Sequence, residues 1–191
     1  FGEAHSIIER HFKTGSVHHG YIEPDSEAAW VDADGTVTVW ANTQSIYSQR
    51  QNIGLLLGIP QSKIKVIPME IGGGFGGKLS TYLEGVAAVL SKKSGRPVKM
   101  TMTRAEVLEA TGPTSGSYIK IKMGVDKSGY ITAAQAYLAF EAGAYPGSPI
   151  GGAVACMFAP YNIKNLLIDG YDVVTNKPKT AAYRAPGAPI G

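Results

Sequence analysis

The chain has 191 residues, which is enough for one or two compact domains with a sizeable core. Hydrophobic residues make up 44% of it and charged residues 17%, and this balance excludes an intrinsically disordered protein. The net charge is only +3 and no run of lysine or arginine forms a basic stripe, so the composition argues against a nucleic-acid-binding protein.

Cys156 is the only cysteine, which excludes an intrachain disulfide and a Cys-rich zinc site. It lies in an apolar run, so we expect a buried small hydrophobic residue. No apolar stretch reaches the length of about 18 residues that a membrane span needs, so we expect no membrane association. The chain begins at Phe1 without a signal-like segment and stops at Gly191 in a loop, so we expect a fragment of a longer, cytoplasmic protein.

The first half of the chain alternates strands and helices. Hydrophobic periodicity predicts strands at 28–32 and 36–40, a helix at 44–57, a strand at 63–67 and a helix at 80–94. The first two strands flank Ala33-Asp34-Gly35, which is typical of a hairpin turn. Gly58 is placed to end the first helix. The inner side of the second helix is expected to carry Val86, Ala87, Val89 and Leu90.

The second half contains another predicted hairpin. In order, the patterns predict a strand at 97–103, a helix at 104–110, strands at 118–125 and 130–140, a helix at 151–158, a strand at 166–174 and a loop at 175–191. Hairpins interleaved with helices favour an α+β fold with mixed sheets and packed helices over a doubly wound parallel sheet.

The most informative segment is Ile71-Gly-Gly-Gly-Phe-Gly-Gly-Lys78, between a predicted strand and a predicted helix. Five of the six positions 72–77 are glycine, so few Cβ atoms shield the backbone. Such a backbone can adopt positive φ and turn its N–H groups toward a bulky ligand. A helix that starts just after the loop adds a partial positive charge. The segment is therefore typical of an anion-binding loop.

Two nucleotide-binding motifs match this loop by letter. The spacing of Gly72, Gly74 and Gly77 matches the dinucleotide fingerprint, but residues 90–103 contain no acidic residue to hold a ribose. The spacing from Gly72 to Lys78 matches most of a P-loop, but Leu79 stands where Mg²⁺ needs a serine or threonine. A nucleotide-phosphate-binding module that uses residues 72–78 stays an alternative, as does a tight turn without a ligand.

The glycine loop closely resembles a signature loop of the molybdenum hydroxylases, the family that includes xanthine dehydrogenase and aldehyde oxidase. Further stretches resemble landmarks of that family, in the family's order: His18-His-Gly-Tyr-Ile-Glu-Pro24 and residues 39–44, 57–60, 94–98, 103–106 and 182–189. These stretches span essentially the whole chain. Residues 1–191 are therefore similar to a fragment of the large, molybdopterin-binding subunit, and the resemblance implies the α+β fold of its first molybdopterin-binding domain.

The resemblance implies a pterin dithiolene cofactor that holds molybdenum, in its plain form or as a cytosine dinucleotide. The positions that match the family's cofactor-binding residues are Gly73, Gly74, Phe75, Gly76 and Arg184. Unshielded amides suit a polyanionic group, and a planar guanidinium presents fixed parallel donors. Phe75 either contacts the cofactor or holds the loop by packing. Arg184 either approaches the metal centre or is an ordinary surface arginine.

The positions expected next to the substrate are Leu79, Ala185 and Pro186. Xanthine-oxidising relatives carry a glutamate where Leu79 stands and a phenylalanine where Pro186 stands, so the resemblance argues against xanthine. Carbon monoxide dehydrogenases carry a copper-binding cysteine where Ala185 stands, so it argues against that activity too. An aldehyde or an N-heteroaromatic compound is the expected substrate, and the choice between them is open.

The implied reaction is hydroxylation of a carbon atom with water as the oxygen source. Electrons are expected to pass to [2Fe–2S] and FAD groups on partner domains or subunits. The family's general base is a glutamate in a Gly-x-Gly-Glu segment expected beyond Gly191, so no catalytic residue and no metal ligand is assigned here. We therefore expect the fragment to be inactive alone. A non-catalytic structural subunit is the third hypothesis.

Overall fold

A computed structural model describes the whole chain, residues 1–191, which divides into two compact units. The loop unit comprises His19–Thr111 and contains the glycine loop. The strand unit combines Phe1–His18 with Gly112–Gly191. The sequence predicted one fragment over residues 1–191 and did not distinguish these units.

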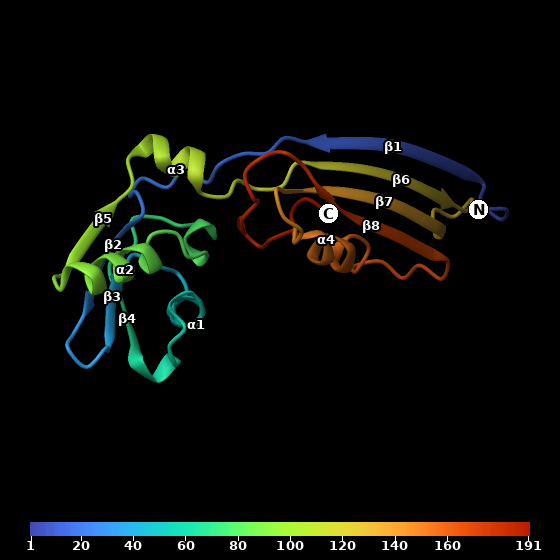
Figure 1. Ribbon diagram of the computed structural model, residues 1–191. Helices are drawn as coiled ribbons and strands as arrows, with labels where there is room; N and C mark the ends of the chain where they lie inside the picture. The colour runs from blue at the N-terminus through green and yellow to red at the C-terminus, as the bar shows by residue number, and fades with distance from the viewer. The chain divides into compact units, whose positions relative to one another are not determined.

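Four strands form the sheet of the loop unit, in the order β4-β3-β2-β5 (Figure 1). β2 and β3 form the predicted hairpin with Ala29 opposite Val39, whereas β3 and β4 are parallel. The strands are β2 (Ser26–Val31), β3 (Val37–Ala41), β4 (Ile64–Pro68) and β5 (Val98–Thr101). The helices are α1 (Ile46–Leu57), α2 (Glu84–Ser94) and α3 (Arg104–Ala110), with 3-10 turns η1 (Gln61–Lys63) and η2 (Gly77–Leu79).

The core of the loop unit lies between one face of this sheet and the helices α1 and α2. Fully buried residues from all three elements pack together there: Ala29, Val39, Ile53, Ala87 and Ala88. Each sheet residue of this cluster points to the same face because side chains alternate along a strand. Gly58 takes the left-handed conformation that ends α1, as predicted.

The inner side of α2 differs from the prediction. Ala87 is buried as expected, but three larger residues are 38–48% exposed: Val86, Val89 and Leu90. The helix begins at Glu84 rather than at residue 80. After Glu84, the buried residues of α2 are all small, because the helix lies close to β2, where Ser91 Oγ accepts the N–H of Val31 at 3.0 Å. Large side chains on that side would hold the helix away from the sheet.

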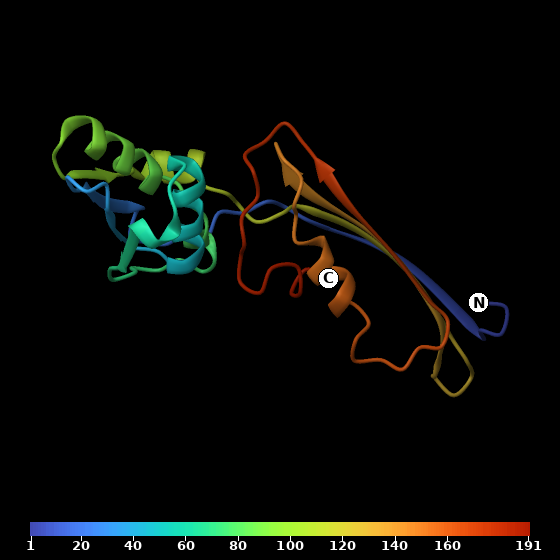
Figure 2. The ribbon, with the colours of Figure 1, turned by 60° about the horizontal axis from the view of Figure 1, so that its bottom comes forward.

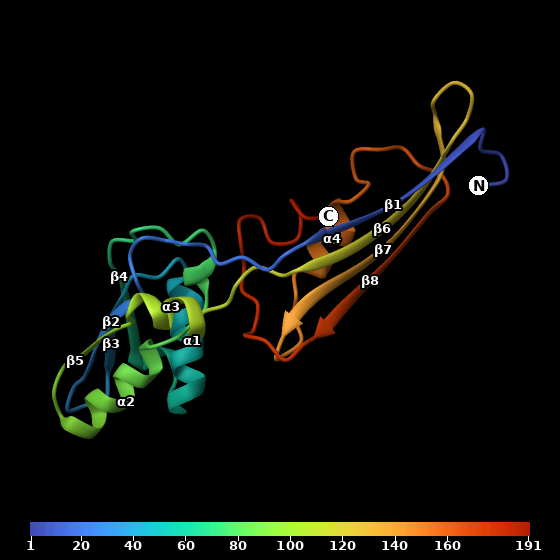
Figure 3. The same ribbon diagram turned by 90° about the horizontal axis from the view of Figure 1, so that it is seen from above.

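The strand unit is built on a second four-stranded sheet, in which Figure 3 shows the strands side by side in the order β1-β6-β7-β8. β6 and β7 form the second predicted hairpin, and β7 runs parallel to β8. The strands are β1 (Ser6–Thr14), β6 (Ser117–Val125), β7 (Ile131–Gly143) and β8 (Leu166–Val174). Parallel and antiparallel pairs occur in both sheets, so the predicted α+β fold with mixed sheets is confirmed.

β1 was not predicted. Its residues are all exposed, and Glu9, Arg10 and Lys13 interrupt the apolar alternation that marks a half-buried strand. Its antiparallel partner β6 places Ser117 opposite Thr14, more than a hundred positions later in the sequence. Such a strand forms because a distant partner offers its edge, and this cannot be deduced from local sequence.

α4 (Ile150–Cys156) lies on one face of the strand unit's sheet (Figure 2). Ala153 of α4 is fully buried with Leu138 and Phe140 of β7. Cys156 is exposed, so the prediction of a buried cysteine was wrong. The apolar run around it forms a short helix that buries only its sheet-facing side. None of the helices has the length and apolar composition that a membrane-spanning segment requires.

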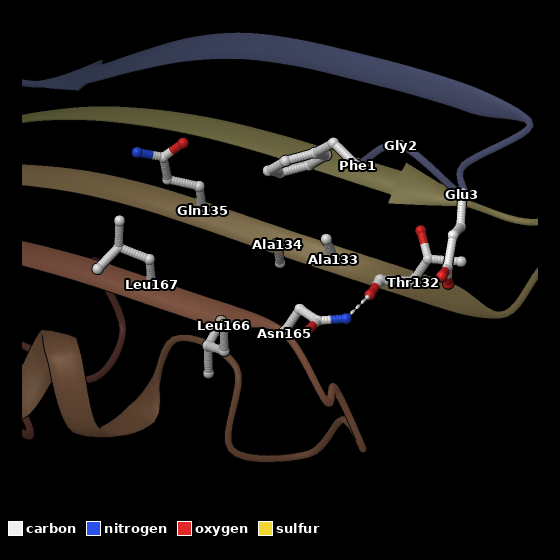
Figure 4. A pocket seen from close by; sticks show the side chains of 10 residues that line it. All are labelled: Phe1, Gly2, Glu3, Thr132, Ala133, Ala134, Gln135, Asn165, Leu166 and Leu167. Carbon is white, nitrogen blue, oxygen red and sulfur yellow. Dashed lines mark hydrogen bonds between the residues drawn. The ribbon is translucent and has the colours of Figure 1, made fainter.

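A hollow of about 560 Å³ lies at one end of this sheet (Figure 4). Its walls include Phe1 and Glu3 near the N-terminus, Thr132 of β7 and Leu166 of β8. Asn165 Nδ2 donates a hydrogen bond to the carbonyl of Thr132 across 3.0 Å. None of the residues predicted to bind the cofactor lines this hollow.

Candidate functional site: a glycine bend wrapped around Tyr21

The glycine loop follows β4 and folds against Tyr21, which is 1% exposed. A Cβ at Gly73 would lie 3.1 Å from Tyr21 Cβ, and a Cβ at Gly77 would lie 2.8 Å from Tyr21 Cε1. The Lys78 ammonium lies 5.0 Å from the centre of the tyrosine ring. Glycine is therefore required where the backbone passes the ring, and the two sequence landmarks around Tyr21 and around Gly72 meet in space.

Two side chains hold the backbone of the loop. Glu23 Oε2 accepts the N–H of Gly72 at 2.7 Å and a hydrogen bond from Lys78 Nζ at 2.9 Å. Gln44 Oε1 accepts the N–H groups of Gly76 at 3.0 Å and Lys78 at 3.2 Å. The Gln44 N–H in turn donates to the carbonyl of Lys78. The ends of the loop are therefore fixed by hydrogen bonds within the loop unit.

The middle of the loop is different. No hydrogen bond engages the N–H groups of Gly73, Gly74 or Phe75, although the N–H of Gly77 donates to the carbonyl of Gly74 at 2.8 Å and closes a turn. Phe75 has a φ of 54°, a left-handed conformation that a phenylalanine adopts only under constraint. Three consecutive backbone donors without a partner remain able to bind an anion.

The glycines of the loop are needed for close contact with the side chains that hold it. A Cβ at Gly72 would lie 2.5 Å from Glu23 Cβ, and a Cβ at Gly74 would lie 2.6 Å from Gln44 Oε1. Real Cβ atoms do not approach other heavy atoms so closely, so an alanine at either position must move the loop or its support. From the sequence, these glycines are expected to allow close approach of a ligand. The structure shows that they also admit Glu23 and Gln44.

Lys78 does not act as the lysine of a phosphate loop. Its side chain is 1% exposed, and its ammonium pairs with Glu23 beneath the bend. A P-loop lysine must reach the phosphates, and this one points into the protein. The nucleotide-phosphate alternative is therefore not supported.

The helix after the loop is also not an anion site. α2 begins at Glu84, and only the three-residue turn η2 directly follows the bend. Glu84 Oε2 accepts the N–H of Tyr82 at 2.8 Å, so the protein's own carboxylate lies at the start of the helix. The predicted contribution of a helix terminus at the end of the loop was wrong. The donors of the bend are backbone amides alone.

Three carboxyl groups of the loop unit are buried: Asp25, Glu27 and Glu84, each 2–3% exposed. Burial, and then the charges of Glu84 and Asp25, raise the pKa of Glu27 to about 9. Burial also raises the pKa of Glu84. Burial acts to raise the pKa of Glu23 as well, but the hydrogen bonds from Lys78 and Gly72 outweigh it and lower that pKa. Glu23 is thus the anion that pairs with Lys78, and Glu27 holds a proton at neutral pH.

The other predicted cofactor ligand, Arg184, belongs to the strand unit, where it is exposed. Arg184 and Ala185 have φ values of 29° and 52°. Together with Phe75 they are the only residues other than glycine with positive φ, and all three are positions predicted from the sequence to lie at the site. Unfavourable backbone conformations of this kind cluster at functional sites.

The positions expected near the substrate divide between the units. Leu79 of η2 is 39% exposed and directly follows Lys78 in the loop unit. Ala185 and Pro186 are exposed in the strand unit. Their segment packs closely on α4, since a Cβ at Gly152 would lie only 2.5 Å from the carbonyl oxygen of Pro186. None of the three side chains carries an ionisable group.

The roles of Tyr21, Glu23 and Gln44 were not predicted. From the sequence they are only family landmarks, with no role in shaping the loop. A charged Lys78 inside an otherwise apolar and glycine-rich segment was the available signal, because a buried lysine requires an anionic partner. Which glutamate would supply that partner could not be read from the sequence.

Residues 1–191 match the family described as molybdopterin cofactor-binding domain. The nicotinate dehydrogenase large molybdopterin subunit of Eubacterium barkeri is 32% identical over 193 aligned residues, which cover 99% of this chain and 45% of that protein. The indole-3-acetaldehyde oxidase of Zea mays is also 32% identical, with 96% of this chain and 14% of that protein covered. The chain spans less than half the length of these curated relatives.

Solved structures show the same fold. Aldehyde oxidoreductase from Desulfovibrio gigas matches with a TM-score of 0.88 and 26% identity, over 100% of this chain and 21% of that one. Reconstituted carbon monoxide dehydrogenase from Oligotropha carboxidovorans matches with a TM-score of 0.86 and 29% identity, over 96% of this chain and 24% of that one. The fold that the sequence resemblance implied is therefore confirmed.

Proposed function

Because the chain belongs to the molybdopterin cofactor-binding domain family, we propose that it forms part of the large subunit of a molybdenum hydroxylase. Such an enzyme hydroxylates an aldehyde or an N-heteroaromatic carbon with water as the oxygen source. The observation that carries the proposal is the row of unpaired backbone amides at Gly73, Gly74 and Phe75. The substrate stays open between the two chemical classes.

The bend fits a polyanionic cofactor. Its three unpaired N–H groups are consecutive donors, which suit the oxygen atoms of an anion and not a cation. Gly72 and Gly74 have no room for a side chain on the protein side, so the form of the bend depends on glycine. Charge-assisted hydrogen bonds from amides to such an anion are about twice as strong as neutral ones.

The molybdenum cofactor, when bound, supplies the acceptor for two electrons. The residues of this chain would bind and orient it: the amides of Gly73, Gly74, Phe75 and Gly76 form the predicted contact segment. The Gly76 N–H already donates to Gln44, so we propose that Gly76 contributes through close approach of its backbone. The Phe75 ring lies over Gly73 and would shield that side of the loop from water.

Arg184 is proposed as a further cofactor ligand from the strand unit. Its support is the family resemblance of residues 182–189 and its left-handed backbone, which Ala185 continues. Leu79, Ala185 and Pro186 would face the substrate. Because none of them is ionisable, we propose that they select the substrate by shape and exclude water, which suits an aldehyde or a heteroaromatic ring.

The remaining functions would come from other parts of the enzyme. No Gly-x-Gly-Glu segment occurs in this chain, so we propose that the general base lies elsewhere in the large subunit. Electrons would leave through [2Fe–2S] and FAD groups on partner domains or subunits, and the pterin is either the plain form or a cytosine dinucleotide. A cytoplasmic location stays a prediction that cell fractionation tests.

The test is the composition of the native complex that contains this chain. Metal analysis should find molybdenum in proportion to the large subunit, and denaturation should release a pterin that fluoresces after oxidation. Gly74→Ala should lower both, because its Cβ displaces Gln44 from the bend. Gly15→Ala is the matched control, since a Cβ there meets nothing within 4 Å. A wild-type complex without molybdenum and pterin would refute the proposal and favour a structural subunit.

A further inference from the structure

One carboxylate oxygen joins the two ends of the glycine bend. Glu23 Oε2 is bonded to the N–H of Gly72, where the bend begins, and to the ammonium of Lys78, where it ends. The backbone of Glu23 also donates its N–H to the carbonyl of Gly72 at 3.1 Å. Glu23 and Gly72 therefore hold each other through both backbone and side chain.

The other side-chain contacts of the bend lack this property. Gln44 Oε1 binds the N–H groups of Gly76 and Lys78, both at the far end. Thr43 Oγ1 donates to the carbonyl of Lys78, again at that end. Among the side chains bonded to the bend, Glu23 alone closes it into a ring.

The hydrogen bonds that close the bend are anchored on buried side chains. The Lys78 ammonium is buried and lies over the ring of Tyr21, whose hydroxyl donates to Asp25 Oδ2 at 2.7 Å. A buried ammonium needs a close anion, so Lys78 cannot leave Glu23 without a large cost in desolvation. The two ends of the bend are then held at a fixed separation, and the three amides between them have a fixed direction.

We propose that Glu23 is a positioning residue: by tying Gly72 to Lys78 it aims the unpaired amides of Gly73, Gly74 and Phe75 at the cofactor. The inference rests on the proposed function for the identity of the ligand, and on the hydrogen bonds of the loop unit for the geometry. Glu23 itself does not touch the cofactor in this assignment. Its effect is exerted through the bend.

Glu23→Gln tests the idea with the smallest change. The glutamine can still accept the N–H of Gly72, but it no longer offers a charge to Lys78. In the native complex we expect the cofactor to be lost about tenfold faster, the effect of one charge-assisted hydrogen bond, as measured by fluorescence of the released pterin. Glu9→Gln is the matched control, because Glu9 forms an exposed pair with Lys120 in the strand unit. Its rate should change less than about twofold.

The second measurement does not depend on the cofactor. In cofactor-free large subunit, amide hydrogen exchange at Gly73, Gly74 and Phe75 should be about tenfold faster in Glu23→Gln than in wild type, and unchanged in Glu9→Gln. In a Lys78→Met background, Glu23→Gln should add less than about a twofold change, because one end of the tie is already absent. An undiminished effect in that background would show that the two contacts act independently and would overturn the proposal.

The outcomes separate the two levels of inference. Wild-type complex without a pterin refutes the proposed function, while the exchange experiment still decides whether Glu23 orders the bend. A complex that holds the pterin equally well with Glu23→Gln refutes the positioning role alone. If Glu23→Gln does not fold, Glu23→Asp keeps the charge but shortens the reach, and it should lose the cofactor about threefold faster. Loss at the wild-type rate would overturn the proposal.

Discussion

The two units place their charged side chains in opposite ways. All the buried ionisable side chains lie in the loop unit, and they include Lys78, Glu27 and Glu84 at 1–3% exposure. In the strand unit, Glu9 and Lys120 form a pair in which both side chains are exposed. Exposed pairs contribute at most about 1 kcal/mol, whereas each buried charge costs several kcal/mol to desolvate. Buried charge is thus confined to the unit that shapes the glycine bend.

The difference indicates what the loop unit gains from its polar interior. A polar network with several fixed partners admits few alternative arrangements, while an apolar core tolerates repacking. Both units have an apolar core, but only the loop unit adds buried ionisable side chains to it. The loop unit must hold one particular backbone path.

The largest expected difference between the two units comes from removing one lysine charge from each of them. Lys78→Met should lower the free energy of unfolding of the loop unit by about 3 kcal/mol, because Glu23 loses the buried cation that it pairs with. Lys120→Met should lower that of the strand unit by less than about 1 kcal/mol. Urea unfolding of both variants measures the two values. Equal losses would contradict the proposed division.

Gly74→Ala and Gly15→Ala compare a crowded glycine with an open one. A Cβ at Gly74 lies 2.6 Å from Gln44 Oε1, whereas one at Gly15 has open space. We expect a loss of about 2 kcal/mol at Gly74 and a change within about 0.5 kcal/mol at Gly15. Urea unfolding of both variants measures the two free energies. If Gly74→Ala leaves the free energy of unfolding unchanged, Gln44 can move away from the added Cβ without cost, which contradicts the prediction.

Glu27 makes the stability of the loop unit depend on pH. Its pKa is raised from 4.5 to about 9, so between these values the folded state keeps a proton that the unfolded state has released. Stability should therefore fall as pH rises through this window, by at most about 1.4 kcal/mol per pH unit. Glu27→Gln should flatten that slope and stabilise the unit at pH 8. Urea unfolding from pH 5 to pH 9 tests this, and an unchanged slope would contradict it.

The smallest effects concern the left-handed residues, which occur in both units. Phe75→Gly and Arg184→Gly should each stabilise their unit by about 0.5 to 1 kcal/mol, since glycine relieves the unfavourable φ but loses more entropy on folding. Both should also lower the pterin content of the native complex. Stabilisation with full pterin content would remove these side chains from the proposed site.

The elements that the sequence predicted well are those with local signals. The helix α3 matches its predicted bounds because Thr103 and Glu106 form a capping box that belongs to neighbouring residues. Both hairpins follow from turn residues between alternating strands. The glycine loop was found for a similar reason, since its composition alone implies an unshielded backbone.

What the sequence could not predict depends on distant partners. β1 exists because β6 offers an edge, and the bend has its form because Glu23 and Gln44 reach it from other segments. The inner side of α2 was predicted from large apolar residues, but the helix lies so close to β2 that mainly small residues fit between them. The family resemblance identified these segments one by one, but only the structure shows that the segment around Tyr21 contacts the glycine loop.

In the sequence, the residues of the loop unit separate the two segments of the strand unit, and this sets an order of synthesis. Thr14 and Ser117 are hydrogen-bonded neighbours 103 positions apart, and a ribosome that adds about 5–20 residues per second needs about 5–20 seconds to make the interval. Throughout that time β1, with Ile7, Ile8 and Phe12, has no strand to join. Once the inserted residues have folded, the carbonyl of Val17 and the N–H of Thr114 can meet at 2.9 Å, so a long connection becomes a short one. A substitution that prevents the loop unit from folding would therefore also leave β1 unpaired for longer in the nascent chain. An unpaired strand can be bound by chaperones or can aggregate.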